Sequence, residues 1–321
     1  MPSPRKFMPH ESILFVTTRT EEGLPFVQSL ILNFLLWGIL ARARSLFEVR
    51  ICHFLFMSNH LHLLLMVRSP EDLPDFMRYI KTESSHAVNK LLGRKKKTIW
   101  EEDYDAPQLL TPTKVLHYIK YLYLNPVRAR LVDSIEAYPG VSSWRLFKND
   151  LTVTYHPRVP RSLIRELPLP ALSINEQRRI VSSWECLELK MNKLVLEPWA
   201  WVERFPGIDV AEAKQRLLND ITKLEARYRR ERKRKRQNVV GPTTLRRQSM
   251  LKEHTPETRK PRVLVFCENP ELKKQYLKLY RELCKKSSEV YERWKLGDFT
   301  PRIPPGMFAP SLPVYCSRLW L

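Results

Sequence analysis

The sequence predicts an α+β fold: an antiparallel sheet of ferredoxin-like or palm-like plan with helices on one side, followed by a mainly helical, basic C-terminal region. Two adjacent apolar segments, 49–58 and 60–67, have the composition of a buried strand pair with a turn near Ser58-Asn59. Segments of helical length separate the strands of the first half. The second half contains a helix-capping pattern and runs of Lys and Arg.

The elements of the first half follow in order along the chain. Thr111 suits the N-cap of the last helix, and Pro112 suits its first position. Pro126 should end or kink that helix, because the residue before a proline avoids the helical region. The predicted elements are a strand at 12–20, a helix at about 25–45, strands at 49–58 and 60–67, a helix at about 71–92, a strand at 98–104 and a helix at about 112–124.

Residues 24–41 form a strongly apolar segment that is nearly long enough to span a membrane. The segment contains Gln28, Ser29 and Asn33, and Glu21-Glu22 precede it instead of a basic stretch. We therefore expect a helix that is buried against the sheet. No secretion signal is evident, so we expect a cytoplasmic protein that does not enter a membrane.

The character of the sequence changes after Trp144. Four prolines lie within residues 150–172, which predicts an extended linker. Ser173-Ile-Asn-Glu176 is a capping-box pattern that opens a helix to about Lys193. The remaining elements expected are a helix at 210–236, a short strand at 262–267 and a helix at 271–296. The predicted organisation is a domain at 1–149, a Pro-rich linker at 150–172 and a helical basic region at 173–321.

Composition and charge limit the class of protein. The chain has 321 residues, enough for two domains, and 43% hydrophobic residues, enough for packed cores. Its formal net charge is +21 and its pI is about 9.9. This charge favours a polyanionic partner over the alternative that it serves only solubility. The cysteines have no metal-type spacing and are expected to be reduced thiols. They are Cys52, Cys186, Cys267, Cys284 and Cys316.

The pair His60 and His62 is the first candidate for chemistry. Residues two apart on a strand point to the same face, roughly 6.6 Å apart along it. Both imidazoles can therefore reach one metal ion if the segment is extended. The alternative is that both are core histidines whose hydrogen bonds are satisfied by neighbours.

A second candidate group lies on the predicted helix at 112–124. Tyr121 and Asn125 stand four residues apart and can share one face at its C-terminal end. A phenol can act as a nucleophile, and an amide oxygen can complete the coordination of a divalent ion. Such an ion polarises a phosphoryl oxygen and neutralises charge as the bond breaks.

These residues resemble the single-tyrosine HUH transposases, in particular the REP-associated tyrosine transposases. Met57-Ser-Asn-His-Leu-His-Leu63 is similar to their His-hydrophobic-His strand, and Tyr121-Leu-Tyr-Leu-Asn-Pro-Val-Arg-Ala129 is similar to their catalytic helix. Ile99-Trp-Glu-Glu-Asp-Tyr104 falls where the family has a strand with Trp, and Ser142-Ser-Trp144 matches the family's closing motif. The resemblance covers about residues 10–147.

The resemblance implies a chemistry. Tyr121 would attack a backbone phosphate of single-stranded DNA, forming a 5′-phosphotyrosine and freeing a 3′-hydroxyl. His60, His62 and Asn125 would hold Mg²⁺ or Mn²⁺ at the scissile phosphate. A 3′-hydroxyl of a second strand would then reverse the step and complete strand transfer. Two imidazoles favour Mn²⁺ or a heavier transition ion, whereas Mg²⁺ prefers oxygen ligands.

The helix offers other candidates for the nucleophile and for a ligand. Tyr118 lies three residues before Tyr121 and can occupy a similar face, although position in the motif favours Tyr121. Tyr123 points elsewhere and is expected to pack or to contact DNA. His117 is either a further ligand or auxiliary base, or an ordinary surface or core residue.

Two positions depart from the family pattern. Glu101-Glu102-Asp103 stands where a basic residue normally precedes the aromatic, and an acidic run there repels phosphate or binds metal. Phe15 stands in the first strand where the family often has His.

Three basic groups are candidate DNA contacts, and a solvated surface is the alternative for each. One is a loop after the second helix, one follows the Tyr121 helix, and one ends the helix at 210–236. Their residues are Arg94, Lys95, Lys96, Lys97, Arg128, Arg130, Arg232, Lys233, Arg234, Lys235 and Arg236.

Two functional classes are therefore in competition. The first is a metal-dependent transposase and nickase of single-stranded DNA that acts at hairpin-forming repeats, as a monomer or a homodimer. The second is a domesticated relative that binds such DNA without cutting it. Together His60, His62, Tyr121 and Asn125 favour the enzyme, because binding alone does not require these four residues.

Overall fold

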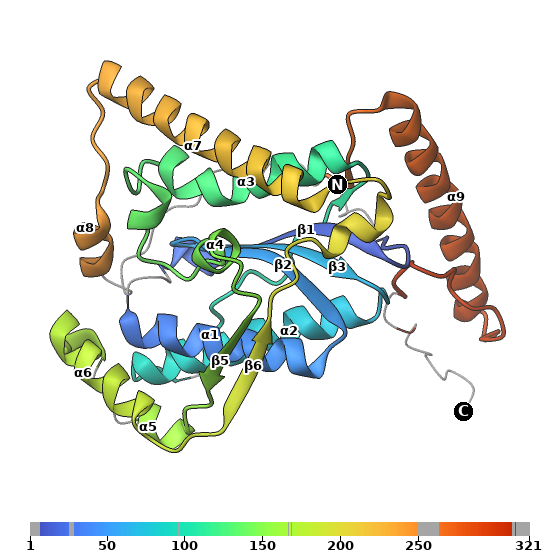
Figure 1. Cartoon of the computed structure of the whole chain (residues 1–321). Coiled ribbons are helices and arrows are strands. Elements are labelled where there is room, and N and C mark those ends of the chain that lie inside the picture. The colour runs from blue at the N-terminus through green and yellow to red at the C-terminus, as the bar shows by residue number, and fades with distance from the viewer. Residues whose placement is uncertain are drawn as a thin grey trace, which may run out of the picture.

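The computed structural model describes residues 7–25, 29–95, 97–165, 167, 169–248, 263–309 and 312. A five-stranded sheet with the order β2-β3-β1-β4-β7 lies at the centre (Figure 1). All of its pairings are antiparallel except that of β4 with β7. The strands are β1 Ser12–Arg19, β2 Val49–Phe56, β3 His60–Val67, β4 Gln108–Leu109 and β7 Val265–Phe266.

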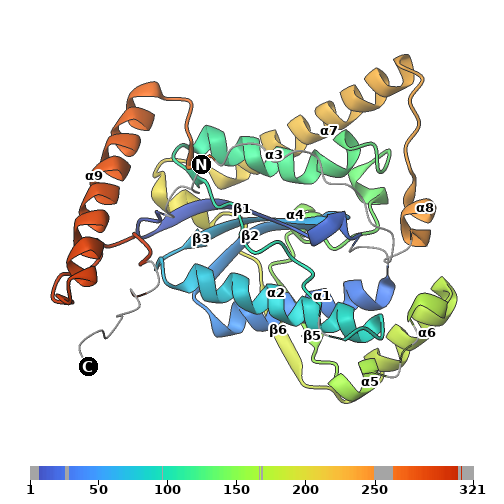
Figure 2. The ribbon, with the colours of Figure 1, turned by 180° about the vertical axis from the view of Figure 1, so that it is seen from behind.

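Helices cover both faces of the sheet, so the expected α+β class is confirmed but the expectation of helices on one side is wrong. Helices α1 (Leu30–Leu46) and α2 (Asp72–Leu91) lie on one face, and α3 (Pro112–Arg128) lies on the other (Figures 1 and 2). The reason is the composition of β3, which is apolar on both sides. Leu63 and Leu65 face the first layer, whereas Leu64 and Met66 face the second.

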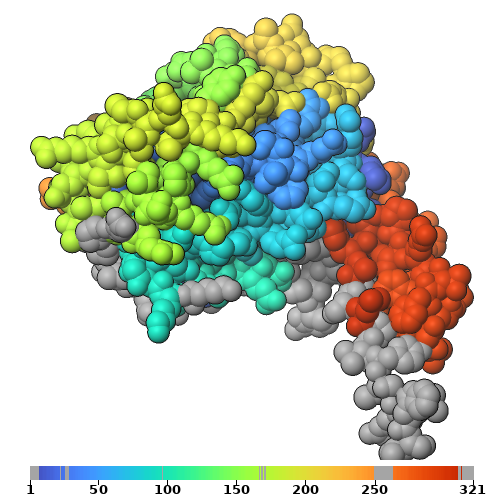
Figure 3. Space-filling model, turned by 90° about the horizontal axis from the view of Figure 1, so that it is seen from below, coloured from blue at the N-terminus to red at the C-terminus, as the bar shows by residue number. Residues whose placement is uncertain are grey.

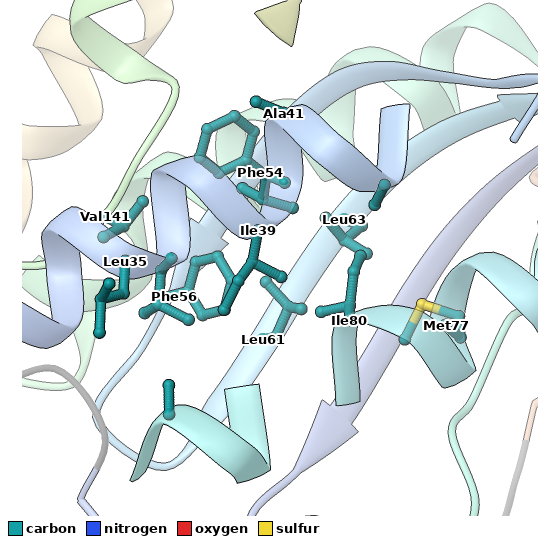
Figure 4. Close-up of a cluster of buried hydrophobic side chains, with 14 of the residues drawn as sticks. Leu35, Ile39, Ala41, Phe54, Phe56, Leu61, Leu63, Met77, Ile80 and Val141 are labelled. Atoms are coloured by element: carbon teal, nitrogen blue, oxygen red, sulfur yellow. The ribbon is translucent and has the colours of Figure 1, made fainter. Parts of the chain in front are cut away.

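The core under α1 and α2 is built from aromatic and branched side chains. Phe54, Phe56, Leu61 and Leu63 of the sheet have no more than traces of exposed surface. They pack against residues of the two helices, as Figure 4 shows for Leu35, Ile39, Met77 and Ile80. Helix α1 is thus a buried helix, as expected. No helix in the described part of the chain is long and apolar enough to cross a membrane.

Residues 150–172 do not form the expected extended linker. Strand β5 (Val153–Pro157) pairs antiparallel with β6 (Met191–Val195), and both pack on α1. Gly38 permits this approach, because a Cβ there would lie 2.9 Å from the carbonyl oxygen of Pro157. Two short helices follow, α5 (Arg161–Arg165) and η3 (Leu169–Ala171), and they bury Ile164 and Leu169 in the first core. Pro157 ends β5 and Pro160 directly precedes α5, so these two prolines lie at the boundaries of elements instead of preventing them.

Helix α6 (Ile174–Glu185) ends earlier than expected, since β6 occupies residues that were predicted to be helical. Its N-terminus is the expected capping box: the Ser173 hydroxyl accepts from the Glu176 amide at 3.3 Å, and the Ser173 amide donates to the Glu176 carboxylate at 2.7 Å. The C-terminal half therefore adds layers to the first sheet: α6, β5 and β6 on one side, and α7 (Val210–Arg234) across α3 on the other.

The second core lies between the sheet and α3. It contains Tyr123 and Trp201, which are fully buried, with Trp144 and Phe147 of α4 (Trp144–Lys148). Leu217 and Ile221 of α7 close it from above. The remaining short elements are η1 (Glu21–Gly23), η2 (Ile135–Ala137), η4 (Ala200–Arg204) and α8 (Pro242–Arg247).

Two expectations for the region around α3 are corrected. Residues 98–104 form no regular strand: Trp100 makes an isolated bridge to Thr20, the residue after β1, and the Glu101 amide donates to the carbonyl of Arg19 at 2.9 Å. The Lys81 ammonium group donates hydrogen bonds to the backbone carbonyls of Glu101 and Glu102. These two carbonyls are therefore not used in hydrogen bonds between strands. Helix α3 continues past Pro126 to Arg128, because Pro126 sits in the last turn, where its missing donor costs one hydrogen bond.

Helix α9 (Pro270–Lys295) matches the expected helix and projects from the body of the molecule (Figures 1 and 3). After it, the chain returns to the N-terminal segment, where the Met8 amide donates to the carbonyl of Gly306 at 2.8 Å. Cys52, Cys186, Cys267 and Cys284 are free thiols, and Cys316 lies outside the described residues.

The buried hydroxyl of Tyr123 gives a test of the second core. It lies 2.7 Å from Nδ1 of His53 and 2.9 Å from Oγ of Ser143. Tyr123→Phe removes the hydrogen-bond partner of both His53 and Ser143 in a site that water does not reach. We therefore expect a loss of about 1–3 kcal/mol in the free energy of unfolding. Urea denaturation measures this. Tyr155→Phe, at a side chain that is 60% exposed, should leave the midpoint unchanged; equal midpoints for both variants would contradict the prediction.

Candidate active site

The two histidines of β3 project toward α3. In the antiparallel register of β1 with β3, His62 lies opposite Thr17 and His60 lies opposite Arg19. The two imidazole rings are T-shaped, with centroids 4.6 Å apart. Leu61, which lies between them in the sequence, points to the other face and joins the first core. The strand therefore presents both imidazoles on one surface, as the sequence predicted.

Hydrogen bonds fix the tautomer of each ring. Nδ1 of His60 lies 2.8 Å from Oδ1 of Asn59, which can only accept, so Nδ1 carries the proton. For His62, Nε2 accepts from the Asn125 amide nitrogen at 2.8 Å, and Nδ1 donates to the Thr17 hydroxyl at 2.9 Å. The Nε2 lone pair of His60 is the one available to a cation, whereas that of His62 accepts from Asn125 and becomes available when the Asn125 amide turns over.

Burial keeps both imidazoles neutral. It lowers the pKa of His60 to about 4, and the charge of Arg19 adds to this effect. Burial also lowers the pKa of His62 well below its usual range, with contributions from His60 and Arg19. A neutral imidazole is the form that binds metal ions, so no proton has to be displaced near pH 7.

Helix α3 brings Tyr121 and Asn125 to the same place. They lie four residues apart on one face, and Asn125 contacts His62 directly. The ring centroids of Tyr121 and His62 are 5.7 Å apart. Phe15, the residue that departs from the family pattern, stacks on His62 with centroids 5.1 Å apart. The structure thus places the two imidazoles, the carboxamide and the phenol in one group.

The other tyrosines of α3 have different surroundings. Tyr118 packs between Phe15 and Phe266, with centroids 4.7 and 4.5 Å away, and burial raises its pKa. Tyr123 is fully buried in the second core and therefore packs instead of contacting a ligand. Both Tyr118 and Tyr121 are partly buried, but the Tyr121 ring contacts His62, so Tyr121 is better placed as a nucleophile than Tyr118.

A pocket of about 650 Å³ opens beside these side chains. Phe15, His62, Tyr118 and Tyr121 form its aromatic wall, and Arg128 holds its guanidinium carbon 4.8 Å from the Tyr121 ring centroid. The rest of the lining includes residues of β1, of α7, of the acidic segment and of β7: Thr17, Arg19, Glu101, Asp103, Asp105, His117, Lys120, Leu224, Tyr228 and Phe266.

The basic residues predicted to contact DNA fall into separate places. Arg128 and Arg130 are exposed at the end of α3, next to the pocket. Arg94, Lys95 and Lys97 lie in the loop after α2, and Lys96 lies outside the described residues. That loop leads directly to Trp100, which bridges to the end of β1 near His60.

The basic end of α7 needs one correction. Arg232 is buried and forms an ion pair with Asp133, so its guanidinium stabilises the fold and is not open to a phosphate. The following residues are exposed, namely Lys233, Arg234, Lys235 and Arg236. Tyr228 lines the pocket, and Lys233 and Arg234, the last two residues of α7, lie about 8–9 Å farther along the helix axis.

Several residues of the site were not found from the sequence. Thr17 and Asn59 orient the imidazoles. The sequence predicts the turn at Asn59 but neither the contact of its side chain with His60 nor the strand register that places Thr17 opposite His62. Leu224, Tyr228 and Phe266 complete the pocket from segments more than 90 residues beyond α3. The sequence predicts the helix that carries Leu224 and Tyr228 and the short strand that carries Phe266, but it does not predict that either element reaches the site.

Comparison with known proteins agrees with the resemblance. Residues 31–122 match the family model of IS200-like transposases. This segment contains His60, His62 and Tyr121, so the resemblance is confirmed over the part of the chain that carries them. No curated protein sequence matches this chain. A solved structure of a REP-associated tyrosine transposase bound to a REP hairpin matches with 18% identity, covering 46% of this chain and 86% of that chain, with a TM-score of 0.39. The family match supports a role as a transposase.

The buried histidines predict a pH dependence of stability. The folded-state pKa of His60 is about 4, below its ordinary value of 6.5, so folding favours the neutral form. The contribution of this group to the free energy of unfolding is fully present above pH 6.5 and is lost as the pH falls toward 4. The free energy of unfolding then decreases by up to about 1.4 kcal/mol per pH unit for each such group. Urea unfolding in chelator at pH 7, 6 and 5 measures it. His60→Asn should flatten the slope, and His10→Asn, at an exposed position, should not.

Proposed function

We propose that this protein is a metal-dependent transposase that cleaves and rejoins single-stranded DNA through a 5′-phosphotyrosine on Tyr121. The observation that carries the proposal is the position of His62. Its ring lies against Asn125 at 2.8 Å, 4.6 Å from the His60 ring and 5.7 Å from the Tyr121 ring. Tyr121 and three side chains able to bind a metal therefore lie close together, and Tyr121 and His62 reach the wall of the pocket.

The donor set fits a divalent cation. His60 and His62 each offer an Nε2 lone pair, and Asn125 offers its amide oxygen if the amide turns over. Asn125 would be the third protein ligand; within the described residues no group of three or more His, Cys, Asp or Glu side chains is placed to hold a metal. A bound Mn²⁺ or Mg²⁺ would polarise a phosphoryl oxygen and offset its charge.

The covalent step follows from the position of Tyr121. Its phenolic oxygen forms a bond to phosphorus as the bond from phosphorus to the 3′-oxygen breaks, and the phenolic proton leaves the tyrosine while the 3′-oxygen gains one. The phosphodiester is kept as a tyrosyl ester, so no nucleotide cofactor is required. Attack by the 3′-hydroxyl of a second strand restores the phenol. Arg128, over the Tyr121 ring, is placed to contact the phosphate.

The pocket supports an unpaired strand as the substrate. Phe15, Tyr118 and Phe266 give it aromatic walls, and bases that are not paired can stack on such side chains. Exposed Arg130 and the exposed run Lys233–Arg236 supply cations near the pocket for the backbone. We propose hairpin-forming repeats as the target, acted on by a monomer or a homodimer in the cytoplasm.

A covalent-adduct assay tests the nucleophile. Wild-type protein, incubated with hairpin single-stranded DNA and Mn²⁺, should give a protein–DNA band that survives denaturing electrophoresis. Tyr121→Phe should abolish the band, whereas Tyr118→Phe should retain it. A shifted but uncleaved complex with every metal tested would instead indicate a DNA-binding protein that does not cut.

The hydroxyl of Thr17 gives a test of the metal site. Because it accepts from Nδ1 of His62, Thr17→Val should misorient the ring and weaken Mn²⁺ binding by roughly 10- to 100-fold in calorimetry. Thr18→Val is the matched control, since Thr18 is buried on the opposite face of the same strand. Equal Mn²⁺ affinities for the two variants would show that the Thr17 hydroxyl does not orient His62 for metal binding.

A further inference from the structure

Helix α9 packs on only one of its sides. Of its 26 residues, Tyr276, Ser287 and Trp294 are buried. Tyr276 and Tyr280 contact Phe7, with ring centroids 5.5 and 6.2 Å away. The helix stands out from the rest of the molecule in every view, most clearly in Figure 3. Most of its surface is therefore open to a partner.

The open side carries a row of cations. Lys274, Lys278, Arg281 and Lys285 are spaced by four, three and four residues, which places them on one face over about 16 Å. All four are exposed. Lys278 and Lys285 each lie two residues from a buried residue, Tyr276 and Ser287, and two residues on a helix reach nearly the opposite side. We call these four residues the α9 stripe.

The charge of the α9 stripe is not compensated within the fold. None of its four cations forms an ion pair in the described part of the chain, although Glu282 and Glu289 lie along one edge of the stripe. Like charges three or four residues apart on a helix destabilise it by about 0.2–0.5 kcal/mol per pair. A polyanion laid along the stripe would relieve this repulsion.

The chain connects the stripe to the candidate active site. Phe266 lines the pocket, and α9 begins four residues later at Pro270. Glu268, between them, accepts from the hydroxyl of Thr111 at 2.6 Å, and Thr111 is the N-cap of α3, the helix that carries Tyr121. The start of α9 is thus held beside the start of α3.

We infer that the α9 stripe binds the backbone of double-stranded DNA, namely the stem of a hairpin whose unpaired strand lies in the pocket. This inference rests on the proposed function for the position of the unpaired strand. The face of the stripe has no aromatic side chain on which an unpaired base could stack, in contrast to the pocket. Four cations on a rigid helix, over about 16 Å, instead match roughly half a turn of duplex.

The test compares two charge-matched variants of the full chain. One replaces the stripe by Lys274→Gln, Lys278→Gln, Arg281→Gln and Lys285→Gln. The control removes four exposed cations far from α9, by Arg178→Gln, Arg179→Gln, Lys190→Gln and Lys193→Gln. Circular dichroism checks that both are folded. Fluorescence anisotropy measures Kd for a hairpin and for an unstructured strand of equal length, each over a range of salt concentrations.

We expect the stripe variant to bind the hairpin at least about tenfold more weakly. The slope of log K against the logarithm of the salt concentration should be smaller in magnitude by about two to four. Its affinity for the unstructured strand, and the control's affinity for the hairpin, should change less than about threefold. Unchanged hairpin binding, an equal loss in the control, or an equal loss for the unstructured strand would each overturn the inference. So would binding to phosphatidylglycerol vesicles that depends on the stripe while hairpin binding does not.

The covalent-adduct assay keeps the two proposals apart. The stripe variant retains Tyr121 and the pocket, so it should still form the adduct at saturating DNA. If the wild type forms no adduct but the stripe variant loses hairpin affinity, the cleavage proposal fails and the assignment of the stripe stands.

Discussion

The pairing of β1 with β3 is the constraint on which the site depends. It places Thr17 opposite His62 and so supplies the hydroxyl that orients the imidazole. Both faces of β3 are buried, one under α1 and α2 and the other under α3. A slip of one residue would exchange Leu61 and Leu63 with the histidines and bury polar rings in an apolar core. The same packing that stabilises the sheet therefore fixes the face of β3 on which the two imidazoles lie.

Helix α7, which crosses α3, contributes further residues to the lining of the pocket. Helix α7 is held there by Leu217 and Ile221, which are buried, and by the ion pairs of Lys120 with Asp220 and of Arg232 with Asp133. This contact brings Tyr228 to the pocket. Because Arg232 is used to hold the helix, the cations left for a ligand are those beyond it.

The sequence predicts the parts of the site that depend on local spacing. The step of two between His60 and His62 and the step of four between Tyr121 and Asn125 are properties of a strand and of a helix, so both could be derived without coordinates. Apolar residues at nearly every position of β3 indicate two buried faces, which explains why helices cover both sides of the sheet. The prolines of residues 150–172 predict an extended linker, but a proline is compatible with the end of a strand, and Pro157 ends β5. The role of Phe266 depends on the parallel pairing of β7 with β4, a contact across more than 150 residues that no local pattern specifies.

That parallel pair limits how the molecule can be divided. The segment that matches the transposase family ends at residue 122, yet the wall of the pocket is finished by a strand near the other end of the chain. A fragment cut after α4 would expose the edge of β4 and the ring of Tyr118, and it would leave α3 without the helix that covers it. The segment that matches the family consequently does not contain the whole pocket, whose wall is completed by residues outside that segment.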